Sequence, residues 1–582
     1  MNPSSLMLTS GSAADQLAAA RTSPQIVEAC ALCRAFLSAS QSRDDAVDAA
    51  LAAAVLQQLK LLLSPGLSVA AVAAAAELLA ALLLAADAEF VAAVVAAGGP
   101  QLLAAALRRR LPDCTSSGAP APQRAHAAGA AEALLHCVAL LAGDSPRHSE
   151  SHSGARLALA VGGALQPIAM ALGGAVTAGA EEAPKEYMRG CRFWAVSALR
   201  NLARESKLRE AVLGAGVLAP LLGILSAPMA GEEEGGDPPP SSEGAGGGRV
   251  WQELPLRTRL RACVCEALTN LSCSDRNKEQ IVGDGRALAA LVAALRLPSA
   301  HAREAAVNAL GCLSSFCPEA QIQLGELGAL PLLQPCVAAV GAHGPLAIAM
   351  REGALSLLMN AALIDQNREA LYTVNGGAVI SSVVACVHAE QTDDPLDGDV
   401  DGGGSQSPLE VQASAVRLLS LLVKQAGPDE RRALQELGVL QAFGAFLREE
   451  REREAELLRQ RSGLRLNFMT SFVNAAGAAM GGGQGVAQAM GGATAPRRRG
   501  AADYAREAVQ ALSESGDLAS ALLADGAAAA PGRSGGGVFL PPGSAQAQEA
   551  ALLAVPGVVH VLAIPTALQS AQTAAGRENG DL

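Results

Sequence analysis

The best candidates for metal chemistry are three aspartates at alternate positions, Asp397, Asp399 and Asp401. Carboxylates spaced in this way, followed by a glycine, open the loop that wraps calcium in helix–loop–helix sites. The twelfth position of such a loop supplies a bidentate glutamate, but here it is Pro408, and Glu410 comes two residues too late. We interpret residues 389–409 as an acidic insertion and keep a calcium site as the alternative.

Two further motifs have the spacing of reactive sites without the context that such sites need. Residues 532–536 satisfy G-x-S-x-G, but no strand precedes the serine and no helix follows it, as a nucleophile elbow requires. Cys30 and Cys33 have the spacing of a metal or redox pair, but no second pair or nearby histidine accompanies them. We interpret both cysteines as core residues. The sequence therefore predicts no catalytic residues, no metal, no cofactor and no enzymatic activity.

Charge and cysteine usage limit the class of protein. A net charge of −12 argues against nucleic-acid binding, and residues 108–110 and 497–499 are interpreted as a solvated helix end and a charged linker. Cysteines beside helices, such as Cys263, Cys273, Cys312 and Cys317, are expected to be buried free thiols in a reducing compartment. Residues 1–20 contain no charged region followed by an apolar core, so we do not expect a secretory signal, although a transit peptide stays open. We predict a cytoplasmic protein, with the nucleus as an alternative.

The stretch from Leu67 to Ala86 is long and apolar enough to be considered as a membrane span. It consists largely of alanine, which is only marginally apolar, and acidic residues follow it before a Gly-Gly turn. We predict a buried helix there and no membrane span.

The elements that organise the chain lie between residues 261 and 340, where one helical unit occurs twice in succession. In each copy apolar residues recur at i, i+3, i+4 and i+7, the stripe of an amphipathic helix. A glycine, Gly285 or Gly328, separates a short helix from the next one. The period of roughly 40–47 residues is typical of solenoids with two or three helices per repeat, and a single unit can bury its stripe only by stacking on its neighbours.

The phrase Ala267-Leu-Thr-Asn-Leu-Ser272, followed by residues 275–282 and Gly285, resembles the armadillo repeat. The same phrase recurs at residues 198–203 and more loosely at 357–362. This resemblance implies an all-α, right-handed α-solenoid. Successive junction glycines suggest seven or more repeats: Gly99, Gly163, Gly216, Gly285, Gly328, Gly377 and Gly438.

The resulting map has four parts. Residues 1–22 are predicted to be disordered, and residues 23–447 to form the solenoid, with the strongest repeats at 186–447 and insertions near 226–253 and 389–409. Residues 448–502 are predicted to be a charged helix and a Gly-rich linker. Residues 503–582 carry weak helical patterns that could form an imperfect terminal repeat.

Armadillo proteins commonly bind extended peptides along a concave groove lined by the third helix of each repeat. The resemblance implies that Asn201, Asn270 and Asn360 line this groove, because an amide can both donate to and accept from a peptide backbone. The residues four positions before these asparagines lie on the same helix face. They are Ser197, Glu266 and Ser356, and Asn308 holds this position in the intervening repeat. Nuclear-import members carry tryptophan there and this chain does not, so recognition of a basic peptide is not implied. A structural role for each asparagine, tying down a helix end or loop, stays open.

We predict a non-catalytic scaffold or adaptor that binds an extended or helical segment of another protein. One alternative is the substrate-recognition subunit of a ubiquitin ligase complex, because plant-type ligases carry similar N-L-S-x-x-D-x-N-K repeats. They join these repeats to a U-box, which we do not find in this sequence. The other alternative is a chaperone-associated or calcium-linked regulator. The sequence does not identify the partner, the pathway or the oligomeric state.

Overall fold

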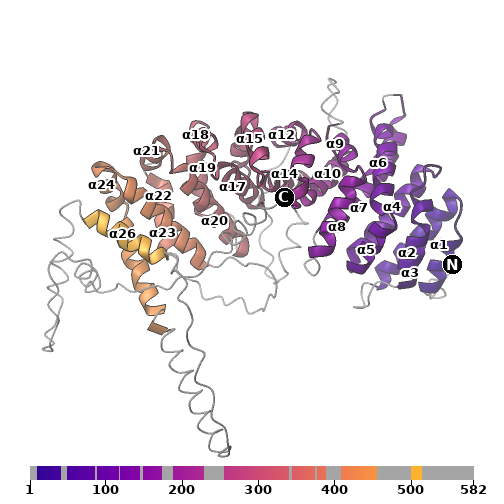
Figure 1. Cartoon of the computed structure of the whole chain (residues 1–582), viewed down its shortest axis with the longest axis horizontal. Helices are drawn as coiled ribbons and strands as arrows, with labels where there is room; N and C mark the ends of the chain where they lie inside the picture. Colours follow the sequence, from indigo (N-terminus) through magenta and orange to yellow (C-terminus); the bar gives the residue numbers. More distant parts are fainter. Residues whose placement is uncertain are drawn as a thin grey trace, which may run out of the picture. The chain divides into compact units, whose positions relative to one another are not determined.

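The computed structural model describes residues 10–40, 49–85, 88–116, 118–143, 149–173, 188–227, 254–339, 344–373, 377–388, 408–453, 455–456 and 500–513. Every regular element in these ranges is a helix (Figure 1). The chain divides into two compact units, residues 1–320 and 321–582. Each unit is described by itself.

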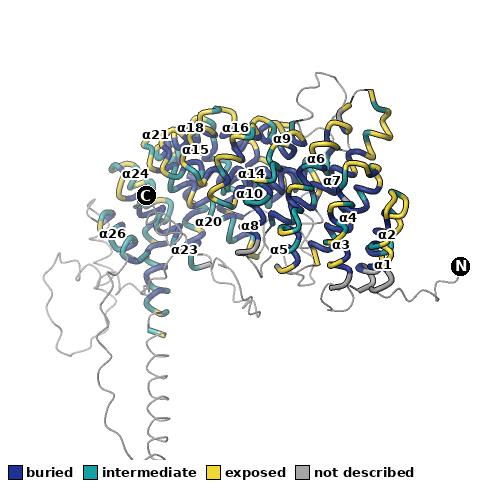
Figure 2. Tube along the Cα trace, turned by 45° about the vertical axis from the view of Figure 1, so that its right-hand side comes forward, coloured by how far each residue is buried: buried dark blue, intermediate teal, exposed yellow. Residues whose placement is uncertain are grey.

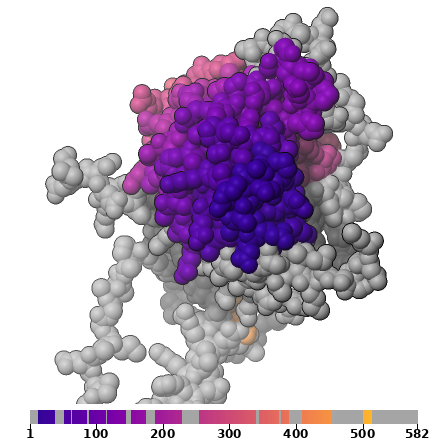
Figure 3. Space-filling model, turned by 90° about the vertical axis from the view of Figure 1, so that its right-hand side faces the viewer, coloured from indigo at the N-terminus to yellow at the C-terminus, as the bar shows by residue number. Residues whose placement is uncertain are grey.

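The first unit contains the helices α1 (Ser10–Ala19), α2 (Ser23–Ser40), α3 (Ala49–Leu62), α4 (Val69–Ala85), α5 (Ala88–Ala96), α6 (Gly99–Thr115), α7 (Ala121–Ala142), α8 (Ser149–Val161), α9 (Leu165–Gly173), α10 (Met188–Leu202), η1 (Ser206–Leu208), α11 (Arg209–Gly214), α12 (Leu218–Ser226), α14 (Leu256–Leu271), α15 (Asp275–Gly283), α16 (Arg286–Ala294) and α17 (Ala300–Ser314). Its N-terminal end faces the viewer in Figure 3.

The second unit takes up the chain within α18 (Pro318–Glu326). It continues through α19 (Ala329–Val337), α20 (Gly344–Ala361), α21 (Asp365–Thr373), α22 (Ala378–His388), α23 (Pro408–Gln425), α24 (Pro428–Glu436), a helix over residues 439–453, and α26 (Ala501–Ser513).

Three helices form each repeat, and helices of one kind stack on their counterparts in the next repeat. In the first unit the third helices α7, α10, α14 and α17 pack side by side in that order. The second helices α9, α12 and α16 pack side by side in the same way. The first helices of two successive repeats, α11 and α15, also pack on each other. In the second unit α19 packs on α22, α20 on α23, and α21 on α24. The predicted all-α solenoid with armadillo-like repeats is confirmed.

Within a repeat, the chain turns from the first helix to the second at a glycine whose backbone angles lie in the left-handed region. Gly285 has a φ of +70° and Gly328 of +67°, and each directly precedes a second helix. A side chain at such a φ would clash with the backbone, so glycine is the residue that makes this turn without strain. At the first of the predicted junctions the left-handed residue is Gly98 rather than Gly99, which is already the first residue of α6.

The core consists of small aliphatic side chains. Figure 2 shows buried residues concentrated on α4, α7, α10 and α14. In α4, which covers most of the Leu67 to Ala86 stretch, Ala71, Leu78 and Leu82 are fully buried within the protein. By length and composition, α7 is the one described helix that could cross a membrane, or one of five candidates if each bent helix pair counts as a span. In α7, 67% of the most apolar 18-residue stretch is buried inside the protein.

The N-terminal end of the described chain differs from the sequence-based map, whereas its C-terminal end holds a helix in the region where weak helical patterns suggested an imperfect terminal repeat. Residues 10–19 were predicted to be disordered, but they form α1, which packs on α2 and α3 with Leu17 only 1% exposed. At the other end α26 packs on α23. There the Ser420 hydroxyl donates to the Tyr504 carbonyl at 3.0 Å, and Lys424 forms an ion pair with Glu507. By its position after α24 and the helix over residues 439–453, α26 is the third helix of a repeat.

Candidate functional site

The candidate site is the open side of the third helices α7, α10, α14 and α17, which we call the third-helix face. Neighbouring third helices flank each of these helices, and the second helix of its own repeat covers a further side. From the partly exposed side chains of these helices we assign nine to this open side. They are Glu132 and His136 on α7, Trp194 and Arg200 on α10, Arg259, Glu266 and Asn270 on α14, and Glu304 and Asn308 on α17.

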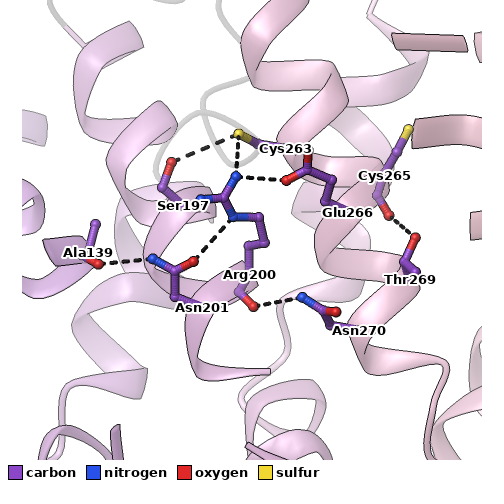
Figure 4. A network of polar contacts seen from close by, with 9 residues as sticks. All are labelled: Ala139, Ser197, Arg200, Asn201, Cys263, Cys265, Glu266, Thr269 and Asn270. Atoms are coloured by element: carbon purple, nitrogen blue, oxygen red, sulfur yellow. Dashed lines mark hydrogen bonds and ion pairs between the residues drawn. The ribbon is translucent and has the colours of Figure 1, made fainter. Parts of the chain in front are cut away.

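Two of the predicted site residues form hydrogen bonds between repeats (Figure 4). The Asn201 Nδ2 donates to the Ala139 carbonyl of α7 at 2.9 Å, and the Asn270 Nδ2 donates to the Arg200 carbonyl of α10 at 3.0 Å. Both carbonyls lie in the last turn of the preceding third helix, where the final four carbonyls have no partner within the helix. Each asparagine therefore joins its helix to the end of the helix before it.

The other predicted residues have varied surroundings. Ser197 is 4% exposed, with its Oγ 4.0 Å from the Cys263 Sγ. The Asn308 amide donates to the Glu304 carboxylate on the same helix. In the second unit, Ser356 is exposed and Asn360 is partly exposed on α20. Peptide contact by these residues stays a prediction.

An ion pair crosses from α10 to α14 next to the asparagines. The Arg200 Nη1 lies 2.7 Å from the Glu266 Oε2 and 3.8 Å from the Cys263 Sγ, as Figure 4 shows. Burial lowers the pKa of Arg200, and the Glu266 carboxylate more than offsets this effect, so the net pKa is raised. The pair therefore holds two repeats together and keeps both charges fixed on the third-helix face.

An aromatic cluster lies near the pair, formed by His136, Phe193, Trp194 and Arg259. The His136 and Trp194 rings stack with centroids 3.7 Å apart, and Phe193 meets Trp194 edge-on at 4.9 Å. The Arg259 guanidinium lies 4.6 Å from the Phe193 ring centroid. The sequence did not predict this cluster, because tryptophan was expected only at the position four residues before Asn201. Trp194 is seven residues before it, two turns along one helix side, and that spacing is the signal that could have found it.

Positive charge is concentrated on the two central third helices. Arginines of α10 and α14 are Arg189, Arg192, Arg200, Arg257, Arg259 and Arg261, and the only acidic residue of these two helices is Glu266. One of them, Arg261, is 5% exposed and donates to the Ala227 carbonyl. The local excess of arginine contrasts with a net charge of −12 for the whole chain.

The titration of His136 should make the stability of the first unit depend on pH. Burial lowers the pKa of His136 from 6.5 to about 4. As the pH falls through this range, the unfolded chain takes up the proton first, so stability is lost from about pH 6.5 down to pH 4 and is unaffected above it. Burial raises the pKa of Glu132, one turn away, and that shift favours the folded state as the pH falls.

We expect the substitution His136→Phe to isolate the histidine effect, because phenylalanine can keep the stack on Trp194 but does not titrate. Between pH 7 and pH 4 the variant should lose about 1–3 kcal/mol less free energy of unfolding than the unchanged protein. Urea unfolding at a series of pH values measures this difference. The exposed His126, changed in the same way, is the control. Equal pH profiles for the two variants would contradict the assignment.

The remaining sequence motifs do not join the third-helix face. Cys30 and Cys33 are both 0% exposed, and burial raises their pKa values to about 12 and about 11, so both thiols stay protonated. Arg109 and Arg110 donate to the carbonyls of Leu63 and Leu67, which is a structural use of the basic cluster. Residues 397–401, 497–499 and 532–536 lie outside the described residues. Among the residues that are described, no group of three His, Cys, Asp or Glu side chains could hold a metal ion.

Comparison with known proteins gave structural neighbours only. No family model and no curated protein matches the chain. Solved structures similar to it include an engineered protein (17% identity, 74% of this chain and 93% of that chain, TM-score 0.41). Another is a computationally designed armadillo repeat protein for modular peptide recognition (18%, 53% and 98%, TM-score 0.35). A third comes from work on a phosphorylation switch between cadherin and β-catenin (16%, 74% and 95%, TM-score 0.39).

These neighbours are distant in sequence and superpose loosely, so the class of the protein rests on its own repeats. Three features define it: successive three-helix units, left-handed glycines at Gly285 and Gly328, and side-by-side third helices. The chain is an α-solenoid with armadillo-like repeats.

Proposed function

We propose that the chain is a non-catalytic scaffold that binds an acidic segment of another protein over α10 and α14. The observation that carries this proposal is the run of arginines on these two adjacent helices, with Glu266 as their one acidic residue. Arginine forms bidentate hydrogen bonds with carboxylates. An acidic segment would gain such bonds here, whereas a basic segment would meet repulsion.

The aromatic cluster supports the same surface. Tryptophan and arginine are the side chains most often found at energetic centres of protein interfaces, and Trp194 and Arg259 lie on neighbouring third helices. Trp194 is one of only two tryptophans in the chain. A partner segment with an apolar side chain among its carboxylates would combine both kinds of contact.

The binding test uses fluorescence anisotropy with two labelled peptides of equal length. One alternates glutamate and leucine, and the other alternates lysine and arginine. We expect the acidic peptide to bind more tightly and to weaken as salt is added, because salt screens exposed charges. Changing Trp251 to Phe leaves Trp194 as the single tryptophan, whose emission should change when the acidic peptide binds. A basic peptide that binds as tightly would overturn the proposal.

Charge reversal locates the surface. The double variant Arg189→Glu and Arg259→Glu should lose about ten- to a hundredfold in affinity for the acidic peptide, since each reversal replaces an attraction of about 1 kcal/mol or more with a repulsion. The control reverses Arg276 and Arg296, which are exposed and lie outside the third helices. Circular dichroism melting must show that both double variants stay folded. Equal loss in both would place binding elsewhere.

We infer a location in the cytoplasm or the nucleus. The inference is supported by the free cysteines, nearly all of them buried, which suit a reducing compartment. A fluorescent fusion imaged with organelle markers tests it, and accumulation in a secretory compartment would contradict it.

A further inference from the structure

Two cysteines differ from all the others in the chain. Cys273 is exposed and Cys312 is partly exposed, whereas every other cysteine is buried. They belong to consecutive repeats, because Cys273 follows α14 and Cys312 lies on α17, and these two third helices pack side by side. The two thiol side chains interact with each other, and the Cys273 Sγ also donates to the Thr269 carbonyl at 3.4 Å. The two thiols that reach the surface are therefore in contact with each other.

Two cations, Arg209 and Lys278, lie near this thiol pair. The Arg209 Nη1 donates to the Cys273 carbonyl at 3.4 Å. The Lys278 Nζ is anchored on the Ser315 carbonyl at 2.8 Å, three residues beyond Cys312. The hydrogen bond with Cys312 lowers the pKa of Cys273 to about 6; burial opposes this shift, and Arg209 and Lys278 add to it. The same hydrogen bond, together with burial, raises the pKa of Cys312. Of the two thiols, Cys273 is therefore the one that loses its proton more easily, and Cys312 is the one that retains it.

We propose that Cys273 and Cys312 are a redox modification site, which peroxide converts into a reversible disulfide between adjacent repeats. An accessible thiolate beside a second thiol is the arrangement that redox-sensing cysteines use. The interpretation of Cys273 as a buried core residue was therefore wrong. Ser272, its neighbour in the repeat phrase, is 1% exposed, whereas Cys273 lies beyond the end of α14.

The chemistry needs one equivalent of hydrogen peroxide and no metal. The Cys273 thiolate attacks one peroxide oxygen, so an S–O bond forms, the O–O bond breaks, and hydroxide leaves to become water. The Cys312 sulfur, after losing its proton, attacks the resulting sulfenic acid. An S–S bond then forms, the S–O bond breaks, and the second oxygen leaves as water. Each sulfur gives up one electron and peroxide gains two. A dithiol reductant reverses the reaction by exchange.

The test treats the folded full-length protein with hydrogen peroxide, blocks the remaining thiols, and analyses the digest by mass spectrometry. We expect one cross-linked peptide pair, Cys273 with Cys312, that disappears after treatment with dithiothreitol. Without peroxide, iodoacetamide should label Cys273 first, with a rate that rises through a midpoint near pH 6. A cross-link between protein molecules, or one that involves the buried Cys317, would overturn the proposal.

Variants separate the two roles. In Cys312→Ser the sulfenic acid on Cys273 should persist and be trapped by dimedone, and no cross-link should form. In Cys273→Ser the rapid reaction with peroxide should be lost altogether. The control is Cys317→Ser, at a nearby cysteine that is 8% exposed, which should leave the cross-link unchanged. Circular dichroism confirms folding of each variant. If Cys273→Ser still forms a disulfide at Cys312, or if Cys312→Ser gives no sulfenic acid, the assignment is wrong.

Discussion

Replacing Phe443 by alanine should cost about 3–5 kcal/mol in the free energy of unfolding of the second unit. Phe443 is 0% exposed and lies on the helix over residues 439–453. Alanine would leave a cavity that the surrounding helices can fill only in part. Because each repeat of a solenoid is stabilised mainly by its immediate neighbours, the loss should be concentrated in the helices nearest to residue 443.

Hydrogen exchange measured by mass spectrometry tests this expectation repeat by repeat, alongside urea unfolding of the whole chain. The control is Phe316→Ala, which removes the same atoms from a side chain that is 89% exposed. That substitution should change the unfolding free energy by no more than about 0.5 kcal/mol. If the two variants lose similar stability, or if exchange speeds up evenly along the chain, the local account is wrong.

The second large effect is expected at Asn277, which is 2% exposed on the first helix α15. Its Nδ2 donates to the Arg209 carbonyl at 2.9 Å and to the Leu271 carbonyl at 3.2 Å, and so joins two repeats. Alanine would leave both carbonyls without this donor. A buried polar group that loses its partner costs about 1–3 kcal/mol, so we expect Asn277→Ala to cost about 2–4 kcal/mol.

Thermal melting and hydrogen exchange in α11 and α15 measure this cost. Asn277→Asp keeps the size of the side chain but loses both N–H donors, so it should destabilise the first unit at least as much. Gln280→Ala, at an exposed position on the same helix, is the control and should change little. The explanation fails if Asn277→Ala is no worse than this control.

The same arrangement recurs in the second unit and accounts for a glycine there. The Asn367 Nδ2 donates to the carbonyls of Gln321 at 2.7 Å and Ala361 at 3.1 Å. A Cβ on Gly325 would lie only 1.8 Å from the Asn367 Oδ1. Because Gly325 has no side chain, the Asn367 amide can approach α18 closely. The position of Gly325 inside a helix would not by itself predict this need for glycine.

The repeat could be predicted from sequence because its signals are local. An apolar stripe and a glycine such as Gly285 lie within a few residues of each other, and both depend on backbone chemistry that any such segment shares. The helix α1 was missed because its buried side includes the small Ala13 and Ala14, which give a weak periodic signal beside polar residues. Only packing on α2 and α3 reveals that side as core.

The contacts of the site could not be predicted because they join residues far apart in the chain. The Asn201 amide bonds a main-chain carbonyl, and every residue carries a carbonyl, so no residue type identifies the partner. The pairing of His136 with Trp194, and that of Cys273 with Cys312, depend on which third helices become neighbours. The period predicts that third helices stack, but not which side chains meet.

Long connections between described helices occur mainly at one kind of junction. Residues 174–187, 228–253 and 389–407 each separate a second helix from the third helix of its repeat. The junction from first to second helix, as at residues 284–285, is short. The length of the connection therefore varies at the junctions where a longer connection does not change how the repeats stack on one another. For protein engineering, these junctions are the natural places to graft a reporter or an affinity tag, and natural variants should differ in length there first.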